Sequence, residues 1–212
     1  GRLPQRIMQH IRRGDRGLVD QNLREGDPAF ANTHSFVIAN NSKSVEALST
    51  AAEGMGYRVV SLSSTVAGDT HDAAQTHARL ARKILTDQDP VGPPACIVSG
   101  GETTVRVVDG GKGGRNQQFV LAAALEIEGL PVSILSVGTD GVDGSTDAAG
   151  AICDGDSVRR ARRFGLDPVS YLDRNDSYSF FERLGDLVKT GPTGTNVMDI
   201  HVVMVGSPDE SN

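Results

Sequence analysis

Residues Cys96 to Gln118 read C-I-V-S-G-G-E-T-T-V-R-V-V-D-G-G-K-G-G-R-N-Q-Q, and this stretch decides the fold class of the chain. The apolar run from Cys96 to Val98 predicts a buried strand. The alternating run T-V-R-V-V predicts a second strand after it. Glycines on both sides of Lys112 then lead into an alanine-rich helix that we expect to begin near Arg115. Strands, a glycine loop and a helix in this order indicate an α/β protein.

The glycine loop has the composition of an anion-binding site. Its backbone N–H groups lack Cβ obstruction, and the dipole of the following helix adds partial positive charge. Lys112 and Arg115 would add full charges, and an arginine can grip an oxyanion with two parallel hydrogen bonds. The alternative is a turn whose glycines only supply positive φ angles. The loop matches neither a Walker A loop nor a G-x-G-x-x-G fingerprint.

Outward from this stretch, apolar runs alternate with helical periods between residues 35 and 205. We expect strands over residues 36–39, 57–62, 132–137 and 198–205. We expect helices over residues 43–55, 70–86, 116–128, 157–164, 168–172 and 178–184. This alternation predicts a layered α/β sandwich with a mainly parallel or mixed sheet flanked by helices. Its first strand, helix and strand predict a βαβ unit with a parallel pair.

The first 34 residues differ from the rest of the chain. A short helix over residues 3–13 is followed by a polar stretch with few apolar residues to bury. We therefore expect residues 1–34 to be an N-terminal helix and linker; the family resemblance described below implies that they are the remnant of a missing N-terminal domain. Residues 35–212 are expected to form a C-terminal α/β domain.

Composition excludes several partners. The net charge is −6 and no basic stripe stands out, which argues against nucleic acid. No apolar run is long enough to span a membrane. The two cysteines lie inside apolar runs and fit a reducing compartment, so we expect a cytoplasmic protein. The sequence does not indicate an oligomeric state.

A second loop, G-T-D-G-V-D-G-S-T-D-A-A-G-A from Gly138 to Ala151, carries Asp140, Asp143 and Asp147. Carboxylates crowded at a strand end repel one another unless a cation or hydrogen-bond donors compensate. A Mg²⁺ ion held by carboxylates and substrate phosphates would do so, and an acid–base role is also open. The alternative is a series of turns in which each aspartate accepts local N–H groups.

A third loop, T-G-P-T-G-T-N-V, runs from Thr190 to Val197. The hydroxyl of Thr195, the amide of Asn196 and the backbone N–H groups could hold a carboxylate or a phosphate. The alternative is a tight turn that enters the last strand.

Five motifs in order, S-G-G-E-T-T-V, G-K-G-G-R-N-Q, the aspartate loop, N-D-S-Y-S-F-F and T-G-P-T-G-T-N-V, resemble the C-terminal half of glycerate 2-kinases. That half includes the MOFRL domain, and these proteins were long labelled hydroxypyruvate reductases. The resemblance implies transfer of phosphate from ATP to the 2-hydroxyl of D-glycerate, with Mg²⁺, giving 2-phosphoglycerate. It implies a cleft between two α/β domains, with the nucleotide mainly on the N-terminal domain. This chain would then supply the substrate side, need its own N-terminal domain as partner, and be inactive alone.

The motifs and the resemblance together nominate site residues. Arg115, which the resemblance makes the cleft arginine, and Asp140 are expected to be catalytic. The expected metal ligands are Asp140, Asp143 and Asp147. The expected substrate- or phosphate-binding residues are Gly100, Gly101, Glu102, Lys112, Gly113, Gly114, Asn116, Thr195 and Asn196. The chain departs from the family at Gln118, Ser145 and Met198, where Glu, Pro and Asn are common.

Two alternative functions stay open. A hydroxypyruvate reductase would need a dinucleotide fingerprint, and no G-x-G-x-x-G follows a strand in this sequence. A non-catalytic anion-binding module would keep the fold without the chemistry.

Overall fold

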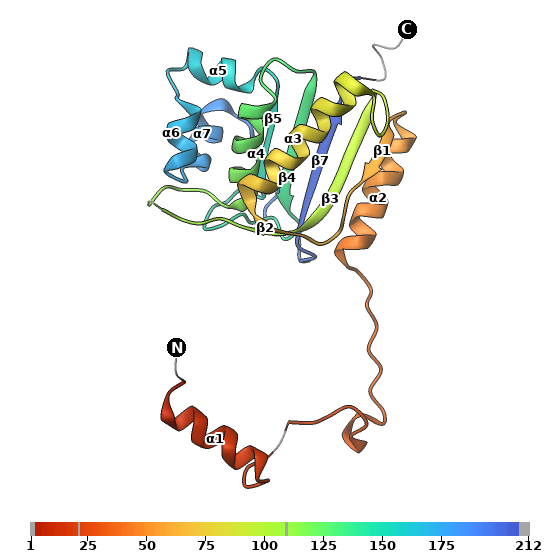
Figure 1. The fold of residues 1–212 in the computed structure, drawn as a ribbon, viewed down its shortest axis with the longest axis vertical. Coiled ribbons are helices and arrows are strands. Elements are labelled where there is room, and N and C mark those ends of the chain that lie inside the picture. The colour runs from red at the N-terminus through yellow and green to blue at the C-terminus, as the bar shows by residue number, and fades with distance from the viewer. Residues whose placement is uncertain (1–2, 21, 109, 208–212) are drawn as a thin grey trace. The chain divides into compact units, whose positions relative to one another are not determined.

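The computed structural model describes residues 3–20, 22–108 and 110–207. The chain divides into two compact units, Gly1–Ile38 and Ala39–Asn212. The first unit contains helix α1 (Gln5–Asp15), which confirms the predicted N-terminal helix, and the 3-10 helix η1 (Pro28–Phe30) (Figure 1). Neither helix buries a residue, so this unit has no core of its own.

The strand predicted over residues 36–39 does not form. Phe36, Val37 and Ile38 have no regular structure, and their exposed fractions are 83, 73 and 87%. A strand needs a neighbour that pairs with its backbone, and an apolar run cannot specify that neighbour. The predicted βαβ unit is therefore wrong for this segment, although its helix is present as α2 (Asn41–Gly54).

The second unit is built on a seven-stranded mixed sheet. Its strands are β1 (Arg58–Ser61), β2 (Val66–Asp69), β3 (Ala95–Thr104), β4 (Val132–Gly138), β5 (Gly150–Asp154), β6 (Leu187–Val188) and β7 (Asp199–Val205). The order across the sheet is β1-β3-β7-β4-β5-β6, and β2 also pairs with β3. β1 and β2 run parallel to β3, and the other pairs are antiparallel.

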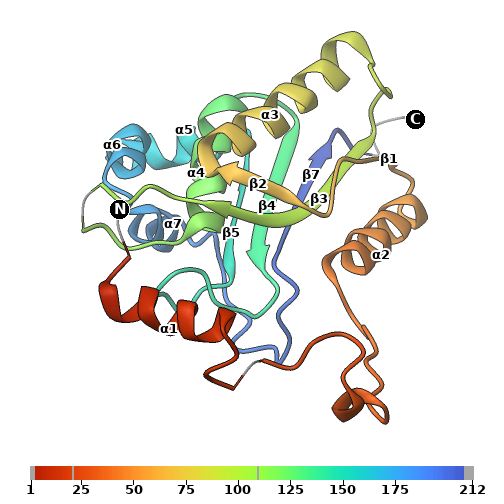
Figure 2. The same ribbon diagram turned by 60° about the horizontal axis from the view of Figure 1, so that its bottom comes forward.

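Helices cover both faces of this sheet, which confirms the predicted layered α/β sandwich. One face packs against α3 (Thr70–Asp87), α4 (Arg115–Glu126), α5 (Ser157–Arg163), α6 (Pro168–Asp173) and α7 (Ser177–Leu184). The other face packs against α2, which lies across β1, β3 and β7 (Figure 2). Among the described residues, no helix is both long and apolar enough to cross a bilayer.

Two differences from the predicted strands concern the central stretch and the aspartate loop. Residues 95–104 form one long strand, and Val107 and Val108 beyond it are exposed rather than paired. β2 lies beside the second half of β3 and pairs with residues Gly101 to Thr104. Most of the T-V-R-V-V run, which was predicted to be a strand of its own, lies beyond this pairing. β5 begins at Gly150, inside the stretch expected to be loop, where an added Cβ would meet Ser136 O at 1.9 Å.

Strand β7 places polar groups in the core. Its alternation buries Val203 and Val205 against α3 and α4, while Val202 and Met204 face α2. Asp199 and His201 share the first face because side chains two residues apart point the same way. Both are fully buried. These buried polar residues lead directly to the site.

Candidate functional site

Arg115, the first residue of α4, is held by two carboxylates. Its Nε donates to Asp199 Oδ2 at 2.5 Å and its Nη2 donates to Asp199 Oδ1 at 2.9 Å. Its Nη1 lies 3.0 Å from Glu102 Oε1. The Asp199 side chain is fully buried, whereas those of Arg115 and Glu102 are 33% and 54% exposed. The hydrogen bonds to Asp199 are the main cause that raises the pKa of the Arg115 guanidinium, which stays charged.

A cavity of about 360 Å³ opens beside this arginine. Its lining includes four predicted site residues, Glu102, Gly113, Gly114 and Arg115. Gln118, one turn along α4, also lines it. Its Nε2 donates to Leu172 O at 2.8 Å. The structure therefore brings the glycine loop, the second half of β3 and α4 together around one cavity.

The N-terminus of α4 is already capped by an internal anion. Asp143 is buried, and its carboxylate accepts the backbone N–H groups of Asn116 and Gln117 at 3.0 and 2.8 Å. It also accepts from the side-chain amides of both residues, at 3.2 and 2.9 Å. Burial raises the pKa of Asp143, and these four donors oppose the shift. The backbone N–H groups of Asn116 and Gln117 are therefore occupied by Asp143, and the predicted anion site depends on the glycine loop and Arg115.

The loop glycines allow close contacts. A Cβ on Gly114 would lie 2.3 Å from the Asp143 carboxylate, and one on Gly113 would lie 2.3 Å from Ser177 Oγ. A Cβ on Gly111 would lie 2.1 Å from Arg174 O. None of these three glycines has a positive φ, so supplying positive φ angles is not their role either. They let the loop pack against Asp143 and the start of α7.

Lys112 belongs to a different cluster, centred on Tyr178. Its ammonium lies 3.6 Å from the centroid of the Tyr178 ring. The Tyr178 hydroxyl donates to Asp147 Oδ1 at 2.7 Å, and Lys189 Nζ donates to Asp147 Oδ2 at 2.9 Å. The hydrogen bond from Tyr178 and then that from Lys189 lower the pKa of Asp147. Lys112 and Asp147 thus both contact Tyr178 and belong to this cluster, not to the cluster around Arg115.

Asp140 meets the third loop, as the predicted site requires. Its Oδ2 accepts from Asn196 Nδ2 at 3.2 Å and its Oδ1 accepts from Val142 N at 3.0 Å. Thr195 bonds locally, since its backbone N–H donates to Thr193 Oγ1 at 3.4 Å. Asp140 and Asp199 both flank Gly138, where an added Cβ would lie 3.1 and 3.6 Å from their Oδ1 atoms.

The three predicted metal ligands do not form one centre. Asp140, Asp143 and Asp147 lie in three separate hydrogen-bond networks. Within the ranges that the structure describes, no group of three His, Cys, Asp or Glu residues is placed to hold a metal ion. Of the three aspartates, Asp140 best fits a Mg²⁺ ion that takes its other ligands from substrate phosphates and water. Its two oxygens accept from neutral N–H groups and keep unused acceptor positions, whereas Asp147 is ion-paired with Lys189 and Asp143 is buried under four donors.

Three further predicted residues, Asn116, Gly100 and Gly101, do not line the cavity beside Arg115. Asn116 is fully buried, and its Oδ1 accepts from Ser136 Oγ at 2.6 Å. Gly100 makes room for Asn41, whose Oδ1 would lie 2.0 Å from an added Cβ. Gly101, at φ +145°, lets β2 approach, because its Cβ would meet Val66 O at 2.2 Å.

Sequence reasoning missed Asp199, although a signal was present. The run D-I-H-V-V-M-V alternates in a strand pattern that places Asp199 on the same face as Val203 and Val205. A carboxylate on a buried face needs a cationic or hydrogen-bonding partner. Arg115, 84 positions earlier, is that partner.

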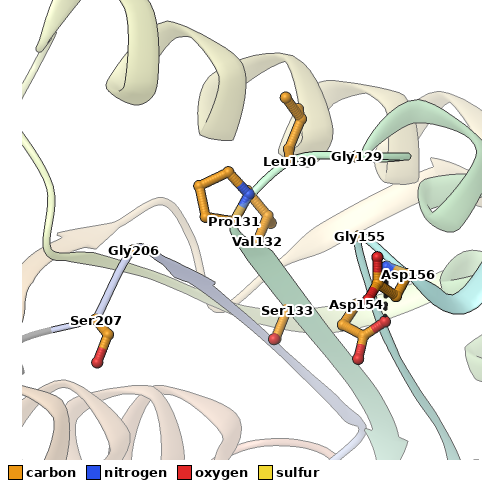
Figure 3. A pocket seen from close by; sticks show the side chains of 10 residues that line it. All are labelled: Gly129, Leu130, Pro131, Val132, Ser133, Asp154, Gly155, Asp156, Gly206 and Ser207. Atoms are coloured by element: carbon orange, nitrogen blue, oxygen red, sulfur yellow. Dashed lines mark hydrogen bonds between the residues drawn. The ribbon is translucent and has the colours of Figure 1, made fainter. Parts of the chain in front are cut away.

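A larger hollow of about 500 Å³ lies at the opposite end of the sheet (Figure 3). It sits where β4 begins and β7 ends, whereas Arg115 lies where β4 ends and β7 begins. Its lining contains no predicted site residue. Of its two carboxylates, Asp154 accepts from Asp156 N and Ser157 Oγ at 2.9 and 3.1 Å, and Asp156 pairs with Arg159. We therefore place the candidate site at Arg115.

Comparisons with known proteins show which proteins the chain is similar to. A family model described as the MOFRL family matches residues 95–199. A glycerate 2-kinase from Pyrococcus horikoshii is 40% identical over 97% of this chain and 46% of its own length. A D-glycerate 2-kinase from Thermotoga maritima is 36% identical over 86% of this chain and 44% of its own length. An Agrobacterium vitis protein provisionally named a hydroxypyruvate reductase is 41% identical over 80% of this chain and 45% of its own length.

Solved structures give the same result. A crystal structure of glycerate kinase from Thermotoga maritima superposes with a TM-score of 0.80 at 36% identity, over 82% of this chain and 42% of that one. A Pyrococcus horikoshii crystal structure superposes with a TM-score of 0.81 at 40% identity, over 96% of this chain and 46% of that one. The chain spans about half the length of the curated relatives it matches.

Proposed function

Because residues 95–199 belong to the MOFRL family and the relatives are named glycerate kinases, we propose that the protein transfers phosphate from ATP to the 2-hydroxyl of D-glycerate. The product is 2-phosphoglycerate. This chain supplies the substrate side of the active site. The observation that carries the proposal is Arg115, a permanently charged group held in a fixed orientation at the rim of the cavity.

Phosphoryl transfer suits this arrangement. The reaction needs cationic groups on the transferred phosphoryl group and a positioned hydroxyl more than it needs covalent chemistry from the protein. Arg115 presents guanidinium donors toward the carboxylate of glycerate or the phosphoryl group. Fixed donors in a partly desolvated cavity stabilise developing charge better than mobile groups do.

Asp140 is the residue that we propose to hold Mg²⁺. When bound, the ion supplies positive charge to the phosphoryl oxygens. Asn196 orients the Asp140 carboxylate through a hydrogen bond at 3.2 Å, and the backbone N–H of Val142 fixes its other oxygen. Asp143 and Asp147 keep structural roles, since their partners already occupy them.

The nucleotide has no recognisable loop in this sequence. We propose that ATP binds mainly to the part of the protein that corresponds to the other half of the relatives' length. Donor and acceptor then face each other across a cleft, which gives the in-line geometry that the reaction requires. The substrates are small molecules, and we expect neither a nucleic acid nor a membrane as a partner. The free, buried Cys96 and Cys153 support a cytoplasmic location.

The test uses the protein at its full encoded length. It is incubated with ATP, Mg²⁺ and D-glycerate, and phosphorus NMR distinguishes 2-phosphoglycerate from the 3-phosphate. A parallel reaction follows NADH oxidation with hydroxypyruvate. We expect 2-phosphoglycerate and no NADH oxidation. Oxidation of NADH without phosphate transfer would replace the kinase with the reductase.

A further inference from the structure

Asp199 is the group that determines where the Arg115 guanidinium points. We propose that Asp199 is a positioning residue for the kinase reaction, one that fixes Arg115 at the cavity rim without touching substrate. This inference rests on the proposed function. It adds a residue that acts only through the arginine.

The first support is the number of guanidinium donors. An arginine carries five N–H donors. Asp199 takes one from Nε and one from Nη2, and Glu102 takes one from Nη1. One N–H on each Nη atom stays available to a ligand. The two-point contact with Asp199 leaves the guanidinium plane no freedom to turn, so these two donors keep a fixed direction.

The second support is the space around Asp199. In the sheet register Asp199 pairs with Gly101 of β3 and Gly138 of β4. Neither neighbour carries a side chain, so the Arg115 side chain can reach a carboxylate that is fully buried. Two glycines beside one acidic residue make room at this rung of the sheet for an arginine from the helix layer.

The third support comes from the opposite face of the sheet. Asn41, at the start of α2, donates from Nδ2 to the carbonyl oxygens of Val197 and Asp199, each at 2.8 Å. Its side chain packs over Gly100, which has no Cβ to block it. The backbone of Asp199 is thus held at the point where β7 begins.

The charges show that attraction of anions is not the purpose of Asp199. Arg115, Asp199 and Glu102 together carry one net negative charge, and Asp199 cancels the positive charge that would draw an anion. The exposed Glu102 contact is weak and replaceable. An anionic ligand can therefore displace Glu102, whereas buried Asp199 stays in place. Its contribution is orientation, which affects the transition state more than ground-state binding.

This reasoning predicts a specific kinetic signature. The variant Asp199→Asn keeps the shape of the side chain but removes the two-point charged contact. Turnover should fall by at least about 10-fold because the guanidinium loses its fixed direction. The KM for glycerate should stay unchanged or fall, because the site becomes less negative. A purely structural defect would lower the amount of folded enzyme without producing this split.

The experiment measures kcat and KM for D-glycerate at full encoded length in Asp199→Asn, Arg115→Ala and the double variant. If Asp199 acts only through Arg115, the double variant should match Arg115→Ala. Asp186→Asn is the matched control, because Asp186 holds Arg160 in the same two-point way, at 2.6 and 3.4 Å, away from the cavity. Near-normal turnover in Asp199→Asn, or a further loss in the double variant, would overturn the proposal.

A readout without activity separates this proposal from the kinase assignment. The Nε–H proton of Arg115, assigned in NMR spectra by its loss in Arg115→Lys, should exchange slowly with solvent in the unmodified protein and rapidly in Asp199→Asn. Fast exchange in the unmodified protein would overturn the positioning role, whether or not any variant folds. A slow signal without kinase activity would instead reject the proposed function and retain the contact.

Discussion

Arg115 illustrates how one residue combines predictable chemistry with an unpredictable partner. Its position after a glycine loop indicated an anion-binding arginine, and the structure places it at a cavity that Glu102 also lines. The loop composition could not indicate that Asp199 would orient it, because that contact depends on the register of β7 between β3 and β4. Local sequence therefore predicts the arginine, while its partner comes from tertiary structure.

The substitution Arg115→Ala should lower turnover of the full-length enzyme by at least about 10²-fold, since it removes a charge-assisted contact with the reacting groups. Steady-state kinetics with ATP and D-glycerate measure the effect, below the unfolding temperature of the variant. The control is Arg160→Ala, which breaks a similar pair with Asp186 elsewhere. Near-normal kinetics in folded Arg115→Ala would remove this arginine from the site.

Met198 carries local backbone strain. Its φ angle is +70°, a left-handed conformation that Asn tolerates better than other side chains. The family resemblance also places Asn at this position. We expect Met198→Asn to be more stable than Met198→Ala by about 1 kcal/mol, because both lose the methionine side chain but only Asn suits the backbone. Urea unfolding compares the two, and equal midpoints would show that the strain contributes nothing.

At the scale of elements, helix α4 owes its start to a residue from another loop. Asp143 supplies the cap that no neighbouring side chain provides, and it engages four N–H donors. The sequence analysis assigned the aspartate cluster and the start of this helix to the same binding site. It could not show that one would cap the other, because carboxylates bind amides and metals with the same oxygens.

Replacing the cap should destabilise the fold. In Asp143→Ala the four donors lose their acceptor, and unsatisfied buried donors cost about 1–3 kcal/mol each. We expect a loss of at least about 3 kcal/mol in the free energy of unfolding. Asp147→Ala, which removes an exposed carboxylate, should cost much less. Similar losses in the two variants, measured by urea unfolding, would contradict the capping role.

A row of buried polar side chains crosses the three central strands. Ser99, His201 and Ser136 face one another in the register of β3, β7 and β4. Since Ser136 Oγ donates to Asn116 Oδ1, His201 Nδ1 must carry the proton that it shares with Ser136 at 2.8 Å. Neutral His77 donates from Nδ1 to Ala73 O at 2.7 Å and accepts from Ser99 Oγ at Nε2 at 2.7 Å. Neutral His77 is therefore satisfied, whereas the buried Nε2 of His201 has no hydrogen-bond partner.

This row predicts acid sensitivity. Burial lowers the pKa of His77, and burial, then His77 and Arg115, lower the pKa of His201 to about 3. Unfolded histidine titrates near pH ~6.5. The unfolded state thus binds more protons below that pH, and stability should fall as pH drops from about 6.5 toward 3, by at most ~1.4 kcal/mol per unit for each histidine.

Urea unfolding between about pH 7.5 and pH 5 measures this dependence. His201→Gln should flatten the pH dependence, whereas His34→Gln, which changes an exposed histidine, should leave it unchanged. An identical slope in His201→Gln and the unmodified protein would show that His201 does not couple protonation to unfolding.

At the scale of the whole molecule, alternating apolar patterns predicted the α/β layers, and the comparisons confirm them. The patterns failed where partners decide structure: segment 36–39, which forms no strand, and the short strands β2, β5 and β6, which exist because longer strands offer an edge. The site followed the same rule. Asp140 and Asn196 were predicted from loop chemistry and lie together. Lys112 and Asp147 instead contact Tyr178, and spacing along the chain cannot predict these contacts.

We propose that this chain holds one side of a kinase active site and that turnover requires both sides. The direct test is phosphorus NMR on ATP, Mg²⁺ and D-glycerate with the 212-residue chain alone, and with the protein at full encoded length. A cooperative thermal transition first establishes that the chain alone is folded. We predict 2-phosphoglycerate from the full-length protein and none from the chain alone. Sustained 2-phosphoglycerate formation by the chain alone would contradict the claim and place the whole catalytic apparatus within these residues.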